Sequence, residues 1–166
     1  GAQKNMGPAG TTLVIIKNEI LKDISENVPT MLNYNTHVDK QSMFNTPPVF
    51  AIYVSMLTLE WLKNIGGIDY IEKLNQKKAQ LLYDEIDRNP YFQGTAHIDD
   101  RSNMNITFLL TDNNKEEEFD KLWKSKGING LKGHRSVGGY RASIYNAMPI
   151  SSIEVLIDTM QKLEKI

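Results

Sequence analysis

The chain has 166 residues, 40% of them hydrophobic, and is long enough for one sizeable core or parts of two. Its formal net charge of −1 gives no indication of nucleic acid or an anionic membrane as a partner. Cysteine is absent, which excludes disulfides, thiolate metal sites and a cysteine nucleophile, and three scattered histidines argue against a histidine-based metal site. We therefore expect a soluble, cytoplasmic protein without a resident metal ion.

The first residues resemble the interior of a protein. They lack an initiator methionine and lead directly into Thr11–Ile16, whose apolar and β-branched residues predict a buried strand. Gly7 and Pro8 are typical turn residues. We infer that the chain is the C-terminal part of a longer protein, with Lys4 in a loop just ahead of a core strand.

Lys4 has two interpretations. An amine in such a loop can carry out Schiff-base chemistry, because desolvation lowers its pKa and favours the neutral, nucleophilic form. A loop lysine taken alone is more often an ordinary solvated residue.

The segment from residue 18 to residue 67 is expected to be mostly helical. Residues 18–25 predict a short helix, and residues 27–41 are expected to be polar and irregular. A longer helix is predicted from Pro47 to Leu62, with Thr46 as its N-cap. Asn45 and Thr46, at the positive end of the helix dipole, are either an ordinary cap or a phosphate site.

A second helix is predicted from Ile68 to Arg88, and we place a domain boundary at its start, with residues 1–67 before it and 68–166 after it. The mixed charges of Lys63–Lys78 indicate a solvated face. Further along, Met104–Leu110 alternates with the period of a half-buried strand. Lys115–Lys126 predicts a helix with acidic residues first and basic residues last.

The C-terminal third is expected to hold two short strands and a final helix. The strands are predicted at Ile128–Leu131 and Ala142–Ala147. Ser151 and Glu154 have the spacing of a capping box, which precedes an amphipathic helix that runs to the end of the chain.

A cationic run lies between those two strands. His134 and Arg135 precede Arg141, and two glycines, Gly138 and Gly139, separate the pair from the second arginine. A guanidinium is a planar fork of donors that suits carboxylate or phosphate, so two such groups can hold a small dianion at both ends. The alternative is a solvated basic loop that pairs with surface acids.

Three stretches together resemble the phosphoserine aminotransferase family, pyridoxal phosphate (PLP) enzymes of the aspartate-aminotransferase-like superfamily. They are Ala-Gln-Lys-Asn followed by Gly-Pro-Ala-Gly at residues 2–10, Phe-Asn-Thr-Pro-Pro at residues 44–48, and the Gly-His-Arg run at residues 132–149. They occur in the family's order and span nearly the whole chain. The resemblance implies an α/β fold, the C-terminal part of a fold-type-I PLP-dependent transferase. Residues 1–67 would end the large PLP-binding domain, and 68–166 would form the small C-terminal domain.

The resemblance also implies the roles of the cofactor residues. Lys4 would carry PLP covalently and act as the catalytic base, with Gln3 near the cofactor phosphate. Asn45 and Thr46 would reach the PLP phosphate of a neighbouring subunit, which implies a homodimer with composite sites.

The substrate residues follow from the same resemblance. Arg141 would bind the α-carboxylate of both substrates, while His134 and Arg135 would favour the substrate phosphate or the distal carboxylate of glutamate. The implied reaction is the reversible transamination of 3-phosphohydroxypyruvate by glutamate, giving O-phosphoserine and 2-oxoglutarate in serine biosynthesis. Some bacterial members also act on a phosphorylated hydroxythreonine of pyridoxine biosynthesis.

In the family, the carboxylate that contacts the pyridine nitrogen, the aromatic that stacks on the ring and most of the phosphate cradle precede the lysine. This chain alone is therefore expected to be inactive. Two alternatives remain open: another PLP-dependent aminotransferase, against which the His134–Arg135 pair argues, and a non-catalytic fragment or anion-binding scaffold.

Overall fold

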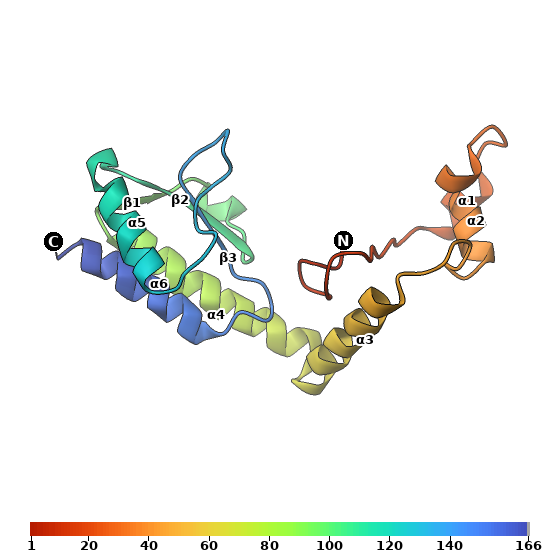
Figure 1. Ribbon diagram of the computed structural model, residues 1–166, viewed down its shortest axis with the longest axis horizontal. Coiled ribbons are helices and arrows are strands. Elements are labelled where there is room, and N and C mark those ends of the chain that lie inside the picture. The colour runs from red at the N-terminus through yellow and green to blue at the C-terminus, as the bar shows by residue number, and fades with distance from the viewer. Residues whose placement is uncertain (166) are drawn as a thin grey trace. The chain divides into compact units, whose positions relative to one another are not determined.

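The structure is a computed structural model that describes residues 1–165. The chain divides into two compact units, the first comprising Gly1–Asn64 and the second beginning at Ile65. The longest helix of the first unit is α3 (Val49–Asn64), and that of the second is α4 (Gly67–Arg88) (Figure 1).

The first unit is helical. Its elements are α1 (Asn18–Lys22), a 3-10 turn (Thr30–Leu32), α2 (Tyr34–Asp39) and α3 (Val49–Asn64). The short helix predicted at 18–25 is confirmed, but residues 27–41 are not irregular throughout. Asn33 caps α2, because its side chain accepts a hydrogen bond from the Asn35 backbone N–H at 2.9 Å.

The strand predicted at Thr11–Ile16 is wrong. This segment has no regular secondary structure, and the side chains of Leu13 and Ile15 are 62% and 89% exposed. A strand needs a neighbour that accepts and donates its backbone hydrogen bonds, and no described segment forms a ladder with this one.

Helix α3 begins later than predicted. Its first residue is Val49, so Thr46 lies before the helix and is not its N-cap. The reason is the Pro47–Pro48 pair, because a proline disfavours the helical conformation in the residue that precedes it. The Ile52 N–H donates to the Pro48 carbonyl at 3.1 Å, which is the first helical hydrogen bond.

The second unit consists of helices on an antiparallel sheet. Its helices are α4 (Gly67–Arg88), α5 (Glu116–Ser125) and α6 (Ile150–Leu163), and its strands are β1 (Phe92–Gly94), β2 (Asn105–Leu110) and β3 (Tyr140–Ser143). Two 3-10 turns, Ile98–Asp100 and Asn113–Lys115, lie in the connections. The sheet order is β1-β2-β3, with Phe92 opposite Leu110 and Thr107 opposite Arg141.

The helices predicted at 68–88, 115–126 and after Pro149 are confirmed, as is the strand at 104–110. The strand predicted at Ala142–Ala147 begins at Tyr140 instead, and Ile128–Leu131 is not a strand. The predicted capping box is also wrong, since α6 begins at Ile150 after Pro149 and has no side-chain cap. Strand β1 was not predicted, because three residues are too few for a periodic signal.

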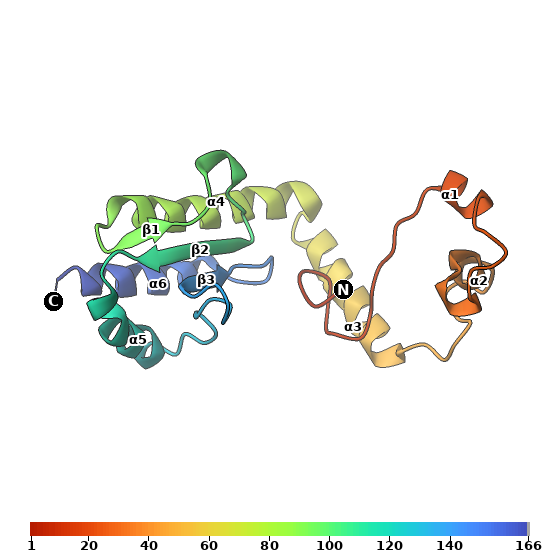
Figure 2. The ribbon, with the colours of Figure 1, turned by 90° about the horizontal axis from the view of Figure 1, so that it is seen from above.

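The core lies on one face of the sheet, where α4, α5 and α6 gather (Figure 2). Its centre is aromatic. Phe92 contacts Phe108 and Phe119 edge-on, with ring centroids 5.7 and 5.0 Å apart, and Tyr140 stacks on Phe108 at 5.4 Å. Because side chains alternate along a strand, the neighbours of Tyr140 and Phe108 point to the opposite face. Arg141 is one of them.

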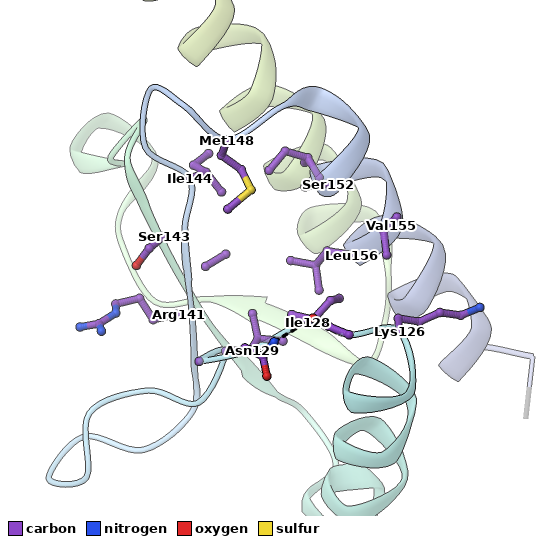
Figure 3. A pocket seen from close by; sticks show the side chains of 15 residues that line it. Lys126, Ile128, Asn129, Arg141, Ser143, Ile144, Met148, Ser152, Val155 and Leu156 are labelled. Carbon is purple, nitrogen blue, oxygen red and sulfur yellow. Dashed lines mark hydrogen bonds between the residues drawn. The ribbon is translucent and has the colours of Figure 1, made fainter. Parts of the chain in front are cut away.

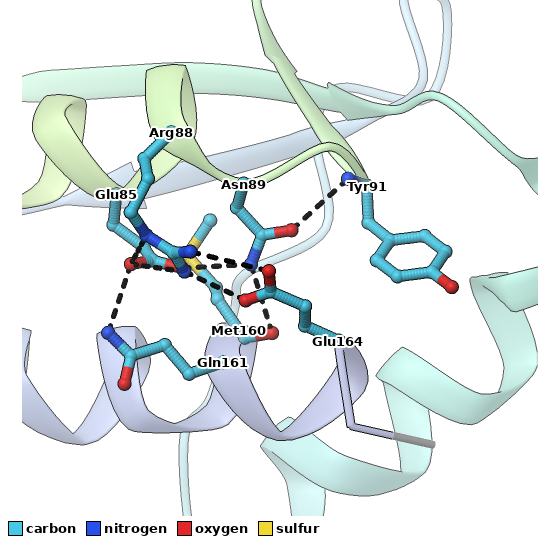
Figure 4. Close-up of polar contacts among 7 residues, drawn as sticks. All are labelled: Glu85, Arg88, Asn89, Tyr91, Met160, Gln161 and Glu164. Atoms are coloured by element: carbon cyan, nitrogen blue, oxygen red, sulfur yellow. Dashed lines mark hydrogen bonds and ion pairs between the residues drawn. The ribbon is translucent and has the colours of Figure 1, made fainter.

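A polar network joins the end of α4 to α6 (Figure 4). The Glu85 side chain is 4% exposed and accepts hydrogen bonds from Arg88, Asn89 and Gln161. Arg88 also pairs with Glu164 at 2.9 Å. The network therefore satisfies a buried carboxylate at the point where the two helices meet.

Candidate active site

Lys4 lies in a tight turn at the start of the first unit. The Ala2 N–H donates to the Thr11 carbonyl at 2.9 Å, and the N–H groups of Met6 and Gly7 donate to the Ala2 carbonyl at 2.9 and 3.0 Å. Ala2 is 1% exposed, whereas the side chains of Gln3 and Lys4 are exposed. The backbone of this turn is thus closed, and Lys4 itself is an exposed residue.

The Lys4 turn is seated on α3. Gly7 has a φ of 156°, and a Cβ at this position would collide with the Ser55 side chain of α3. Gly10 approaches Ala51, one helical turn earlier, so that a Cβ there would lie 3.3 Å from the Ala51 methyl group. The two glycines that follow Lys4 therefore allow the turn to dock closely on α3.

Asn45 and Thr46 precede the same helix, from which Pro47 and Pro48 separate them. Both side chains are exposed, and the Asn45 amide lies 3.7 Å from the Met31 sulfur. The first turn of an α-helix leaves backbone N–H groups without an intrahelical acceptor and forms the positive end of the dipole. The position suits an anion such as a phosphate, although Thr46 does not cap the helix.

The cationic residues of the second unit lie on one hairpin. Lys132 and Tyr140 form an isolated antiparallel bridge, and the Gly133 N–H donates to the Gly139 carbonyl at 2.7 Å. Gly138 and Gly139 have φ values of 77° and 64°, a conformation that glycine adopts at little cost. Residues 133–139, hereafter the cationic loop, carry the His134–Arg135 pair at the exposed tip of this hairpin.

The turn of the cationic loop orients His134. The N–H groups of Val137 and Gly138 donate to the His134 carbonyl at 2.9 and 2.8 Å. The His134 Nδ1 accepts the Ser136 N–H at 3.3 Å and lies 2.7 Å from the Ser136 hydroxyl. From this hydrogen bonding we assign the proton of the neutral ring to Nε2, where it can be donated to an anion.

Arg141 lies on β3, at the base of the hairpin. Its backbone N–H donates to the Leu131 carbonyl at 2.7 Å, and its side chain is exposed because Tyr140 and Ala142 occupy the core face. Arg141 also borders a cavity of about 430 Å³ between β3 and α6 (Figure 3). The guanidinium points away from the interior of this cavity, which Ile144, Met148 and Leu156 line. The apolar cavity is therefore not the anion site.

Lys78 was missed by the sequence prediction, which assigned it to a solvated face. It is 0% exposed, and its ammonium donates to the carbonyls of Ile144, Tyr145 and Met148 at 3.1, 2.8 and 3.1 Å. Its neighbour Asn75 is 4% exposed and donates to the Asn146 side chain at 2.8 Å. The available signal was the position of Lys78, which lies on the same helical face as Ile71, Leu82 and Ile86.

Lys4, Asn45 and Thr46 belong to the first unit, and His134, Arg135 and Arg141 to the second. In the first unit, the Lys4 turn docks on α3, and Asn45 and Thr46 precede the same helix. In the second unit, one hairpin carries all three cationic residues. Among residues 1–165, no cluster of three or more acidic or histidine side chains could hold a metal ion. None of the helices in that range is both long and apolar enough to cross a membrane.

Residues 1–156 match the family model of class-V aminotransferases, and the chain belongs to this family. Its α/β fold is that of the C-terminal part of a PLP-dependent transferase of fold type I. The chain is 63% identical over 164 residues to a phosphoserine aminotransferase of Flavobacterium psychrophilum, covering 99% of this chain and 46% of the relative. A phosphoserine aminotransferase of Bacteroides thetaiotaomicron is 53% identical over 168 residues, covering 100% of this chain and 47% of the relative.

Solved structures agree with the curated relatives. The phosphoserine aminotransferase from Bacillus circulans subsp. alkalophilus superposes with a TM-score of 0.94 at 46% identity, covering 99% of this chain and 46% of that one. A PLP-bound phosphoserine aminotransferase from Trichomonas vaginalis superposes with a TM-score of 0.89 at 36% identity, covering 96% of this chain and 46% of that one. The chain spans about half the length of the curated relatives it matches, 46% for the first of them.

Proposed function

We propose that this chain is part of a phosphoserine aminotransferase, which catalyses the reversible transamination of 3-phosphohydroxypyruvate by glutamate in serine biosynthesis. The observation that carries the proposal is 63% identity, across 99% of the chain, to a relative of that name. The phosphorylated hydroxythreonine of pyridoxine biosynthesis presents the same anionic groups and is a candidate second substrate. We assign the protein to the cytoplasm, as its composition leads us to expect.

PLP is the proposed cofactor, and it supplies an electron sink for the carbanion formed at the substrate Cα. The residues present fit this group. Lys4 is an exposed residue with a primary amine, and the backbone of its turn is held by hydrogen bonds and docked on α3. We assign to Lys4 the covalent attachment of PLP and the movement of the proton from Cα, and to Gln3 a place near the cofactor phosphate.

Asn45 and Thr46 are proposed to bind the PLP phosphate of a partner subunit in a homodimer. Support comes from the surface of α3, which is apolar around most of its circumference. Phe50, Tyr53 and Trp61 are 76%, 55% and 40% exposed in the isolated chain. A helix that is hydrophobic on all sides is normally buried, so this surface is suited to contact the remainder of the subunit and its partner.

The cationic hairpin is proposed to select the substrates. Arg141 binds the α-carboxylate that glutamate and phosphoserine share, using the planar fork of its guanidinium. His134 and Arg135, at the tip of the hairpin, bind the distal group, which is a phosphate in one substrate and a carboxylate in the other. One cationic pocket can accept both, because both distal groups are anions with several acceptor oxygens.

Domain assignment follows the same proposal. Residues 1–67 form the last part of the large PLP-binding domain, and residues 68–166 form the small domain. The chain alone would then bind anions without turnover, as a non-catalytic scaffold. The isolated chain covers 46% of the length of the first relative. This coverage favours anion binding without turnover for the isolated chain.

The test uses both the isolated chain and the full-length protein. Each is incubated with PLP, reduced with borohydride and digested, and the modified peptide is located by mass spectrometry. We expect PLP on the peptide that contains Lys4 in the full-length protein, together with transamination of 3-phosphohydroxypyruvate by glutamate. Lys4→Ala should abolish both. Near-normal transamination by the Lys4→Ala protein would contradict the assignment of Lys4.

A further inference from the structure

The two ends of the cationic loop meet at one carboxylate. Lys132 and Tyr140 are the residues that flank the loop, and they face each other across the isolated bridge. The Tyr140 hydroxyl donates to Oδ1 of Asp120 at 3.0 Å, while the Lys132 ammonium lies 3.0 Å from Oδ2 of the same residue. Asp120 belongs to α5, so one helix holds both ends of the loop through a single side chain.

Asp120 is well suited to act as this fixed point. Its side chain is only 16% exposed, and Oδ1 also accepts the Trp123 indole N–H at 3.0 Å, which locks the carboxylate orientation. Trp123 and Tyr140 are themselves 5% and 3% exposed. The core thus fixes the position of the Asp120 carboxylate, and this carboxylate in turn fixes both ends of the cationic loop.

Electrostatics strengthen the contact. Burial alone raises the pKa of Asp120, but hydrogen bonds from Lys132, Trp123 and Tyr140 outweigh it and hold the pKa below its ordinary value. The Lys132 ammonium also lies 4.9 Å from the centre of the Tyr140 ring and pairs with Glu116. Lys124, on the same helix, approaches Oδ2 to 3.7 Å. The carboxylate therefore remains charged and paired at neutral pH.

The Asp120 contacts constrain His134 and Arg135 more than Arg141. Only Gly133 separates Lys132 from His134, and the tip of the loop makes no ladder hydrogen bonds with β2. Arg141 lies in β3, in register with Thr107, and is held by the sheet itself. Loss of the Asp120 contacts should therefore displace His134 and Arg135 more than Arg141.

We propose that Asp120 is a positioning residue that holds the cationic loop in the geometry needed to bind the distal anion of the substrate. This rests on the proposed function, in which His134 and Arg135 bind the phosphate of phosphoserine. Asp120 does not touch the substrate. It acts through Lys132 and Tyr140, and it affects the distal anion selectively because the α-carboxylate site is built on a strand.

The test compares Asp120→Asn and Asp120→Ala with Glu117→Gln in the full-length holoenzyme. Glu117 is the matched control, because its substitution removes the same charge from the same helix, and its ion pair is with exposed Lys121 at 2.7 Å and not with the loop ends. For Asp120→Asn we expect the KM for phosphoserine and the inhibition constant of inorganic phosphate to rise about tenfold, with kcat little changed. The inhibition constant of alanine, which has an α-carboxylate and no distal anion, should stay within about twofold of the unmutated value.

A double-mutant cycle with Lys132→Met tests whether Asp120 affects phosphate binding through Lys132. If Asp120 acts through Lys132, the second substitution should add little to the first. Amide hydrogen exchange in residues 133–139 should become faster in Asp120→Asn and stay unchanged in Glu117→Gln. Asp120→Glu should restore part of the phosphate affinity.

The outcomes separate the two proposals. If the unmutated holoenzyme does not use phosphoserine, the proposed function fails, while hydrogen exchange still tests the attachment of the loop. Equal losses for phosphate and alanine, or a fall in kcat alone, would assign Asp120 a merely structural role and overturn the inference. Unchanged exchange in residues 133–139 would also overturn it.

Discussion

The ammonium of Lys78 donates a hydrogen bond to the backbone carbonyl of Tyr145 at 2.8 Å, although Tyr145 lies 67 residues further along the chain. The carbonyls of Ile144 and Met148 accept from the same ammonium at 3.1 Å each. A buried lysine on α4 thus holds the segment that follows β3, a few residues after Arg141. Burial lowers the pKa of Lys78.

Lys78→Met should destabilise the second unit. The substitution preserves the apolar stem but leaves three carbonyls without their shared donor, so we expect a loss of about 2–3 kcal/mol in the free energy of unfolding. Urea denaturation followed by circular dichroism measures it. Lys77→Met, at an exposed neighbouring position, is the control and should change the free energy by less than about 0.5 kcal/mol. Equal stability of the two variants would refute the role given to Lys78.

Protonation of Glu85 should lower the free energy of unfolding in acid. Burial alone raises its pKa, but hydrogen bonds from Arg88, Asn89 and Gln161 outweigh this and hold the pKa below the ordinary 4.5. A carboxylate whose folded pKa is depressed contributes stability above its unfolded pKa, and that contribution is lost as the pH falls through the folded value. The unmutated chain should therefore lose stability below about pH 4.5 more steeply than Glu85→Gln.

The measurement for Glu85 is the urea midpoint between pH 7 and pH 3. Glu154→Gln on exposed α6 surface controls for loss of a surface carboxylate and should keep the steep acid dependence. Parallel curves for the Glu85→Gln and unmutated chains would contradict the prediction.

Arg141→Lys should damage both half-reactions of the full-length enzyme. An ammonium cannot reproduce the two parallel hydrogen bonds that a guanidinium makes to a carboxylate, so the loss should be severe for glutamate and phosphoserine alike. Single-turnover absorbance changes of the cofactor, recorded with each amino donor, measure it. A loss confined to phosphoserine would reverse the assignment of Arg141 and the loop residues.

His134→Ala and Arg135→Ala should instead act mainly on phosphoserine, whose phosphate carries more charge than a carboxylate. Removing one charge-assisted hydrogen bond should cost about 1.5–3 kcal/mol, or roughly ten- to a hundredfold in affinity. The same single-turnover assay applies, and Val137→Ala is the control within the loop, because the Val137 side chain is exposed. Equal losses for both donors in His134→Ala, Arg135→Ala and Arg141→Ala would remove the proposed division of roles.

Mixed dimers test whether the sites are shared between subunits. An Asn45→Ala/Thr46→Ala protein should retain PLP weakly, and a Lys4→Ala protein should be inactive. Mixing the two should restore part of the activity, because one hybrid site then has an intact lysine and an intact phosphate contact. Subunit exchange is verified first with differently tagged copies. No restoration after proven exchange would count against composite sites.

Local sequence was sufficient wherever a pattern repeats along one element. The amphipathic period predicted α4, α5 and α6, and alternation predicted β2, because each signal depends on which side of a single element is apolar. The family motifs around Lys4, Asn45 and Arg141 pointed to the family that the comparisons then showed. Short-range capping patterns were less reliable. Thr46 is not the N-cap of α3, because Pro47 and Pro48 delay the start of the helix to Val49.

The sequence by itself determined the family and the order of the longer helices, because both depend on patterns among neighbouring residues. The tertiary structure alone decided which polar residues are buried and what they hold. Lys78 and Asp120 look like ordinary members of charged helices, and their partners lie up to 70 residues away at Met148 and 20 away at Tyr140. Burial of a charge is stable only where distant segments supply its partners, and only folding brings those segments together.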